Sequence, residues 1–377
     1  MILRAASAAP FQRRVLAVGP GEGFITGQSV AFMTYTRKSS HIISIVNTND
    51  EGMSFAAHAA SSIRVIIQSA WHILFRRPEC VYLSTSRSKL GAIKDISVIA
   101  LARSRSVPVV NHLHGSTFVS FRDSLGTLYG GIVDWAYRYI AASIVLHEIL
   151  IPQYSKYPQM TVSVVNNFVD ADVASTVKSD REIVGPINVL FLSNLMPEKG
   201  VFELIESVKS LLSQSDGAIN LKIAGRFLPG GGMSSREVEA RLSQSIAGIP
   251  QIEYCGFADA TTKKRLLAWA HVLALPSYMK EEAIPLAVLE GMAAGCYLIV
   301  SDFGILPHLV KDVVAAVVPA GNIAALENAL AAVMADRRVL LDAALLNPQV
   351  AKANYSEAQY ISGVDGIIGE VSLEAVR

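Results

Sequence analysis

Short runs of apolar residues alternate along the chain with segments whose apolar residues recur every three or four positions. We interpret the following runs as buried strands: 14–18, 42–46, 80–83, 107–113, 143–146, 189–193, 221–225, 252–254, 271–275, 297–300 and 315–318. Helical spacing is clearest in segments 61–75 and 323–335. Because strands that alternate with helices form parallel sheets, the pattern predicts an α/β fold.

The length of the chain predicts two domains. It has 377 residues, more than one ordinary hydrophobic core accommodates. Residues 178–186 are polar and separate two series of strands, so we interpret them as a linker. With 51% hydrophobic and only 17% charged residues, the chain can supply two large buried sheets.

Residues 273–302 form the most informative stretch, and they predict a strand, a loop, a helix and a second strand. Pro285 suits the first position of a helix, because a residue there needs no partner for its backbone N–H. Leu286, Leu289 and Glu290 then recur at helical spacing, and Gly295 is a natural C-terminal stop.

Two glutamates in this stretch are spaced to hold a ligand with hydroxyl groups on both sides of a phosphate. Glu282 lies in the loop, and Glu290 lies about one and a half turns into the helix. Between them, the N–H groups of Ala283, Ile284 and Leu286 can face an anion at the positive end of the helix dipole. A sugar–diphosphate–nucleoside has this layout. The spacing alone is also compatible with two solvated glutamates that flank an amphipathic helix.

The stretch resembles a known motif. Pro-Ser, then Glu-x7-Glu, then Gly-Met-Ala-Ala-Gly and a strand resemble the nucleotide-sugar motif of family-4 retaining glycosyltransferases with the GT-B fold. The resemblance implies that Glu282 contacts the donor hexose, that Glu290 contacts the ribose, and that Pro285 belongs to the donor-binding loop. It also implies two Rossmann-like domains that face a central cleft, at 1–180 on the acceptor side and 181–350 on the nucleotide-sugar side, with helices in 351–377 returning to the first domain.

The same resemblance implies a grip on the donor diphosphate, and here the chain departs from the family. Family members carry an arginine five residues before Lys199, and both side chains hold the diphosphate. This chain has Asn194 at that position, which can donate a hydrogen bond but supplies no charge. Arg226, after the strand 221–225, is a candidate substitute. Gly256 and Phe257 resemble the turn that frames the nucleobase.

The first domain offers further candidates after the ends of strands. The turn GPGEGFITGQS does not fit G-x-G-x-x-G, because Thr26 stands where the last glycine belongs, so nicotinamide binding is not favoured. It resembles the first loop of family-4 enzymes, in which Gly27 would approach the donor or acceptor. His114 ends a strand and matches the position from which the family often brings a histidine to the donor sugar, whereas His147 is a weaker candidate.

Charge is distributed unequally between the two halves. Residues 1–180 hold 17 Lys and Arg against 11 Asp and Glu, whereas residues 181–377 hold 16 against 21. Either the basic half faces an anionic partner, such as a membrane surface or a lipid-phosphate acceptor, or the split is ordinary scatter. Similarly, the helix expected at 61–75 either rests on a bilayer or packs on the sheet.

Other classes of protein are not favoured. The cysteines Cys80, Cys255 and Cys296 are far apart and lie in or beside apolar runs, which is typical of reduced thiols in a cytoplasmic protein. We expect neither a signal peptide nor a membrane span, because no apolar run is long enough. There is no Cys/His cluster for a metal.

Together with these features, the resemblance implies a retaining glycosyltransferase that moves a hexose from a GDP- or UDP-linked donor to a glycan or lipid-linked acceptor, in bacterial polysaccharide, lipopolysaccharide or glycolipid assembly. The resemblance implies no metal cofactor and no nucleic-acid partner. We expect a cytoplasmic protein, with peripheral contact to the inner face of the plasma membrane as an option. Two alternatives stay open: an epimerase or phosphorylase of the same fold, and a non-catalytic partner subunit that has lost part of the site.

Overall fold

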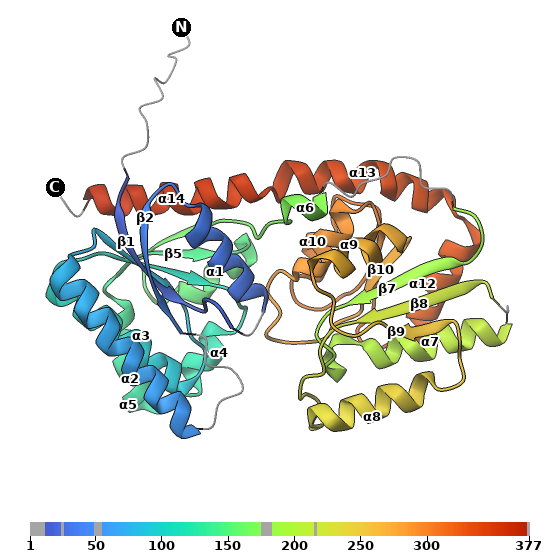
Figure 1. Ribbon diagram of the computed structural model, residues 1–377, viewed down its shortest axis with the longest axis horizontal. Helices are drawn as coiled ribbons and strands as arrows, with labels where there is room; N and C mark the ends of the chain where they lie inside the picture. The colour runs from blue at the N-terminus through green and yellow to red at the C-terminus, as the bar shows by residue number, and fades with distance from the viewer. Residues whose placement is uncertain (1–11, 24–25, 49–54, 175–182, 215–216, 375–377) are drawn as a thin grey trace, which may run out of the picture. The chain divides into compact units, whose positions relative to one another are not determined.

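The computed structural model describes residues 12–23, 26–48, 55–174, 183–214 and 217–374 (Figure 1). The chain divides into two compact units, each described here by itself. Unit 1 comprises Met1–Asn167 and Ala358–Arg377, and unit 2 comprises Phe168–Glu357. The sequence places the borders near 180 and 350. The contacts place the first border earlier, because residues 168–174 belong to unit 2, and the second border later, because the whole helix ending at Asn354 also belongs to unit 2.

Unit 1 is built on a six-stranded sheet in the order β2-β1-β3-β4-β5-β6, in which all neighbouring strands are parallel. Its strands are β1 (Arg14–Gly19), β2 (Ile42–Asn47), β3 (Cys80–Ser84), β4 (Val109–Leu113), β5 (Ile140–Val145) and β6 (Thr161–Val164). The larger helices are α1 (Gly27–Lys38), α2 (Phe55–Trp71), α3 (Lys89–Ser104), α4 (Phe118–Asp123), α5 (Gly126–Tyr137) and α14 (Glu357–Glu374). A π-helical turn, η1 (His72–Arg76), continues α2.

The helices of unit 1 cover the sheet in two layers. Right-handed crossovers place α2, α3 and α5 on one face, because the chain moves from β2 to β3, β4 and β5 in one direction across the sheet. In agreement, α2 packs on α3 and α3 packs on α5 (Figure 1). The opposite face carries α1 and α14, which are joined by a hydrogen bond from the Tyr360 hydroxyl to the Ala31 carbonyl.

Unit 2 has a second parallel sheet, in the order β12-β11-β10-β7-β8-β9. Its strands are β7 (Ile187–Leu192), β8 (Ile219–Ala224), β9 (Ile252–Tyr254), β10 (Val272–Leu275), β11 (Tyr297–Ser301) and β12 (Ala315–Val318). Its helices are α6 (Ala171–Ala174), α7 (Val201–Gln214), α8 (Ser235–Ile246), α9 (Ala260–Trp269), α10 (Leu286–Ala293), α11 (Leu306–Leu309), α12 (Ile323–Ala335) and α13 (Arg338–Asn354).

The α/β class and the parallel sheets expected from the sequence are confirmed, and most strands lie within one or two residues of their predicted bounds. The largest difference is β5, which begins at Ile140 and not at 143 as predicted. The sequence misses its start because Ala141 and Ala142 give a weak apolar signal, although Ala142 is buried. The helix predicted at 61–75 starts earlier, at Phe55. It packs on the sheet, which was one of the two interpretations of this segment. All three cysteines are free thiols. Of the expected linker, residues 178–182 lie outside the described residues.

Candidate functional site

In unit 2 the loops that follow the carboxyl ends of neighbouring strands carry the predicted donor residues. Open parallel sheets bind ligands at this edge. Residues 276–285 follow β10 and lead into α10, as the sequence predicts. Pro285 is the N-cap residue of α10 and not its first helical residue, because its backbone is still extended, with a ψ of 120°. Ala283, Ile284 and Pro285 are buried, which fixes the loop that precedes the helix.

Lys199 and Glu282 form an ion pair, although 83 residues separate them in the chain. Their side chains are only 10% and 14% exposed, so solvent screens the pair weakly. The Ser277 hydroxyl donates a second hydrogen bond to the same Glu282 oxygen at 3.1 Å. Gly200 makes the pairing possible, because its φ is 79° and a Cβ there would collide with the Pro276 carbonyl.

Glu290 lies in the second turn of α10 and is also paired. The residue is 4% exposed, and its Oε1 accepts a hydrogen bond from the Lys263 ammonium of α9 at 2.7 Å. Nearby, α10 offers its first backbone N–H groups, such as that of Leu286, which have no carbonyl four residues earlier in the helix. The start of α10 therefore brings together three kinds of group: the Glu290 carboxylate, the Lys263 cation of the preceding helix α9, and the first amides of α10.

Asn194 lies directly against the loop that carries Arg226. The Leu195 amide donates to the Arg226 carbonyl at 2.7 Å, which joins the loops after β7 and β8. Gly225 has a φ of 158°, and a Cβ there would collide with the Ser193 carbonyl, so the two backbones are in contact. A positive side chain thus begins beside Asn194, the position at which the resemblance implies an arginine.

The Arg226 side chain also reaches the loop that follows β9. Its guanidinium carbon lies 3.9 Å from the centre of the Phe257 ring, and Phe257 is 43% exposed. Phe257 comes directly after Gly256, whose φ of 76° turns the chain. An arginine stacked on an exposed aromatic ring is a surface on which a planar base can lie.

In unit 1, His114 follows β4 and stacks on His112, with ring centres 3.9 Å apart. His112 in turn shares a 2.7 Å hydrogen bond with the Tyr82 hydroxyl. The Nε2 atom of His114 is shielded from solvent and, among the described residues, has no hydrogen-bond partner. Desolvation, followed by the nearby Arg87 cation, lowers the pKa of His114 to about 3. The imidazole is therefore neutral at pH 7 and can exchange hydrogen bonds but not charge.

Gly27 and His147 occupy helix starts in unit 1. Gly27 is the first residue of α1, after a Thr26 N-cap that forms a capping box with Ser29. The capped helix points its N-terminus to the carboxyl edge of the sheet, where an anion is favoured. His147 instead caps the short helix η2 (Glu148–Tyr154), accepting a hydrogen bond from the Ile149 amide, so its place is explained by the fold.

Sequence reasoning missed three partners of the predicted residues: Lys263 beside Glu290, Ser277 beside Glu282, and Arg87 near His114. Ser277 was visible as part of the Pro-Ser pair. Nothing in the pattern marked Lys263 or Arg87, because each meets its partner only through strand order. Among the described residues there is no group of three or more His, Cys, Asp or Glu that could hold a metal ion, and no helix long and apolar enough to cross a membrane.

Residues 176–345 match the family model of glycosyl transferases group 1. A comparison with curated proteins gives no match.

Solved structures share the fold at low sequence identity. Sucrose-phosphate synthase from Thermosynechococcus elongatus is 14% identical with a TM-score of 0.71, covering 97% of this chain and 100% of that one. HepE from Anabaena, in complex with UDP and glucose, is 14% identical with a TM-score of 0.71, and the match covers 95% of this chain and 100% of HepE. A UDP-forming trehalose-phosphate synthase from Burkholderia vietnamiensis is 12% identical with a TM-score of 0.68, and the match covers 97% of this chain and 99% of that one. The chain therefore has the GT-B fold, and its match to glycosyl transferases group 1 in unit 2 supports a glycosyltransferase.

Proposed function

We propose that the protein is a retaining hexosyltransferase that moves a hexose from a nucleotide-sugar to an acceptor hydroxyl. The observation that carries the proposal is the largely buried Lys199–Glu282 pair beside the start of α10. A cation and a carboxylate held together there match the two adjoining parts of the donor, its diphosphate and its hexose. Glu290, farther along α10, is at the right spacing for the ribose.

In the proposed reaction the bond between the anomeric carbon and the diphosphate breaks, so negative charge grows on the leaving diphosphate. Lys199 and the first N–H groups of α10 stabilise that charge, and they do so without a metal ion. Glu282 orients the hexose by accepting hydrogen bonds from its hydroxyls. His114, neutral at pH 7, is the proposed sugar contact from unit 1, and Gly27 the proposed close backbone approach.

Arg226 is the proposed second cation at the diphosphate. Its backbone lies against Asn194, and its side chain is long and flexible and ends in a guanidinium. From the loop after β8 this charge can therefore reach the region that an arginine at 194 would reach from the loop after β7. In this role Arg226 replaces the family's missing arginine, and the Asn194 amide adds only a hydrogen bond.

The donor and acceptor are proposed from chemistry and from likeness. HepE structures contain UDP or UDP-glucose, so UDP-glucose is the first donor to test, with GDP-linked sugars next. We propose a glycan or lipid-linked acceptor in the cytoplasm, in bacterial polysaccharide or glycolipid assembly, with the protein in contact with an anionic membrane.

Donor turnover by a Lys199→Ala variant tests the mechanism. Donors that bind are first found by thermal shift with UDP, GDP and their sugars. We then expect Lys199→Ala to lower kcat on the order of 10²–10³-fold while weakening donor binding less, because charge on the leaving group grows in the transition state. A Lys199→Ala variant as active as the parent protein would rule out this mechanism.

Arg226 and Asn194 distinguish the enzyme from the non-catalytic alternative. Arg226→Gln should lower kcat by at least about tenfold in the parent, and Asn194→Arg should restore turnover to that variant, because one cation replaces the other. Lys222→Gln, on β8 but paired with Glu253 at 3.4 Å, is the matched control and should change little. A parent inactive with every donor and activated by Asn194→Arg would instead identify a site that has lost its catalytic charge.

A further inference from the structure

The outer surface of α2 is apolar where a surface helix is normally polar. Ile63, Ile67, Trp71 and Phe75, spaced four residues apart through α2 and η1, are 58%, 63%, 45% and 72% exposed. The opposite side of the helix is already buried, through a second series at the same spacing: Ser61, Val65, Ser69 and Ile73. The exposed series is therefore additional to the residues that hold the helix on the sheet.

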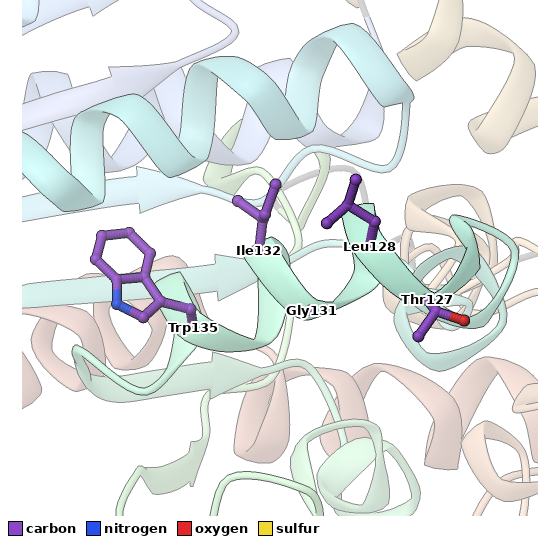
Figure 2. A pocket seen from close by; sticks show the side chains of 5 residues that line it. All are labelled: Thr127, Leu128, Gly131, Ile132 and Trp135. Atoms are coloured by element: carbon purple, nitrogen blue, oxygen red, sulfur yellow. The ribbon is translucent and has the colours of Figure 1, made fainter.

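Helix α5 presents a second apolar series. Leu128, Ile132 and Trp135 are 82%, 44% and 40% exposed. They line a shallow hollow of about 590 Å³ together with Thr127 and Gly131, and Figure 2 shows Leu128 and Ile132 directed to the same side of the helix. Between α2 and α5, α3 adds Ile93, which is 47% exposed.

These residues share one side of unit 1, since α2, α3 and α5 form the layer on a single face of the sheet. We call their solvent side the outer helical face. It is defined by Ile63, Ile67, Trp71, Phe75, Ile93, Leu128, Ile132 and Trp135. An exposed apolar surface spread over three neighbouring helices indicates an interaction site.

The charges interleaved with this face are positive. Residues 55–105 contain eight Lys and Arg but only two acidic residues. Both acids already have partners: Asp95 is 1% exposed and accepts a hydrogen bond from the Ser86 amide at 2.7 Å, and Glu79 pairs with Arg13 at 2.9 Å. The exposed cations of the segment are Arg64, Arg76, Arg77, Lys89, Arg103 and Arg105.

Two of the arginines lie near the exposed aromatic rings, and Arg103 also stacks on Tyr139 at 3.6 Å from the ring centre. The Arg76 guanidinium is 5.0 Å from the Trp71 ring centre, and that of Arg103 is 5.5 Å from the ring centre of Trp135. Cations beside indole rings, with aliphatic side chains between them, are suited to the phosphate level of a bilayer, where the rings and aliphatic groups enter the acyl boundary.

We propose that the outer helical face docks unit 1 on an anionic lipid bilayer. This assigns a surface to the proposed membrane contact, and it does not depend on the sugar-transfer chemistry. The net positive charge selects an anionic surface over a neutral one, and the aliphatic and aromatic groups hold the protein once it is bound. A protein partner or a second copy of the chain would need acidic groups to face these arginines.

Co-sedimentation of the full chain with lipid vesicles tests the proposal. We expect binding to phosphatidylglycerol vesicles, little binding to phosphatidylcholine vesicles, and a decline in binding as sodium chloride is raised, because salt screens exposed charges. Equal binding to both lipids, unaffected by salt, would overturn the proposal.

Variants locate the docking surface. Phe75→Ser and Leu128→Ser should each weaken vesicle binding by about tenfold through lost apolar burial, and Arg76→Gln by about fivefold through lost charge. The matched control is Leu345→Ser, on α13 of unit 2, because Leu345 is 69% exposed but lies outside the face. If Leu345→Ser weakens binding as much as Phe75→Ser, or if none of the face variants does, the assignment is wrong.

Two further readouts separate this proposal from others. Without lipid, sedimentation velocity should give the same species for the parent and for Leu128→Ser. A dimer that Leu128→Ser dissociates would identify the face as an interface between copies and overturn the proposal. Turnover of the soluble donor should be unchanged in Phe75→Ser, so a failure of vesicle binding and a failure of the proposed sugar transfer are observed independently.

Discussion

At the scale of single residues, the donor site depends on carboxylates whose partners are cations from other elements. Glu282 is held by Lys199 and Ser277, and Glu290 by Lys263. A carboxylate held by such partners has a fixed position before any ligand arrives. Less conformational entropy is therefore lost when the ligand binds. In the proposed site the glutamates then need only exchange solvent for sugar hydroxyls.

Glu290→Gln is expected to weaken the binding of free UDP or GDP by about 1.5–3 kcal/mol, because a charged acceptor for the ribose hydroxyls is lost. Isothermal titration calorimetry of the nucleotide measures the change. Lys263→Gln is the control, since it breaks the same 2.7 Å ion pair and leaves the carboxylate in place. If the Lys263 variant loses as much affinity as the Glu290 variant, the ion pair matters and the ribose assignment is wrong.

His114 is expected to make the free energy of unfolding sensitive to acid. Its pKa is about 3 in the folded protein, whereas an ordinary histidine has a value of 6.5. Between these values the unfolded chain binds a proton that the native state does not, so stability is lost as the pH falls, by about 1.4 kcal/mol per pH unit. Above pH 6.5 both states are neutral at this position and the contribution is constant.

Urea titrations of the parent and of His114→Asn measure this slope. A range of about pH 4.5 to 7.5 is suitable, because histidines ordinarily titrate within it. The variant should show a shallower loss of stability below pH 6.5, by up to about 1.4 kcal/mol per unit. Identical slopes would mean that the native imidazole protonates freely and is not shielded as described.

At the scale of elements, one carboxylate ties several segments of unit 1 together. Asp134 of α5 accepts hydrogen bonds from Arg122 of α4, from Lys156 at 2.6 Å and from the Tyr157 hydroxyl at 2.8 Å. Burial alone would raise the pKa of Asp134, but the hydrogen bonds from Arg122, Lys156 and Tyr157 outweigh it and lower the pKa to about 2. The same helix carries Leu128 and Trp135 of the outer helical face.

Asp134→Asn is expected to destabilise unit 1 by about 3 kcal/mol at pH 7, because Arg122 and Lys156 lose a buried partner. The difference should shrink as the pH falls from about 4 towards 2, where the parent's carboxylate is also protonated. Asp123→Asn is the matched control: Asp123 pairs with the same arginine at 2.8 Å but is 58% exposed, so a loss of at most about 1 kcal/mol is expected. Urea unfolding that finds equal losses for both variants would contradict this account.

At the scale of the whole molecule, each unit has its own parallel sheet and its own core, and the proposed tasks divide between them. Unit 2 carries the paired glutamates, the proposed cations and the match to glycosyl transferases group 1. Unit 1 carries His114 and the outer helical face. The excess of positive charge in residues 1–180 is therefore not evenly scattered, because much of it lies in residues 55–105, beside exposed apolar groups.

The end of the chain also belongs to the whole-molecule scale. The sequence expects helices near the C-terminus to return to the first domain, and α14 does belong to unit 1. Asp365 of α14 accepts hydrogen bonds from the Ser40 amide at 2.9 Å and from the Ser39 hydroxyl at 2.6 Å. These contacts join residues that are 325 and 326 positions apart. No local pattern predicts such a contact, since it depends on where the helix lands.

The sequence by itself determined what local backbone geometry controls. Apolar runs specified the strands, the alternation with helices specified parallel sheets, and the spacing between Glu282 and Glu290 placed both beside the start of one helix. Such features depend on residues close together in the chain, whose relative positions follow from the periodicity of strands and helices.

Only the tertiary structure decided which distant residues meet. Strand order brings Lys199 to Glu282 across 83 residues and Lys263 to Glu290 across 27, and it sets Arg226 against Asn194. Packing also decided that His114 is shielded and that Phe75 and Leu128 stay exposed. An apolar residue at helical spacing looks the same in sequence whether its side of the helix faces the sheet or the solvent. The order of strands and the layer of each helix, which arise from long-range packing, settle that choice.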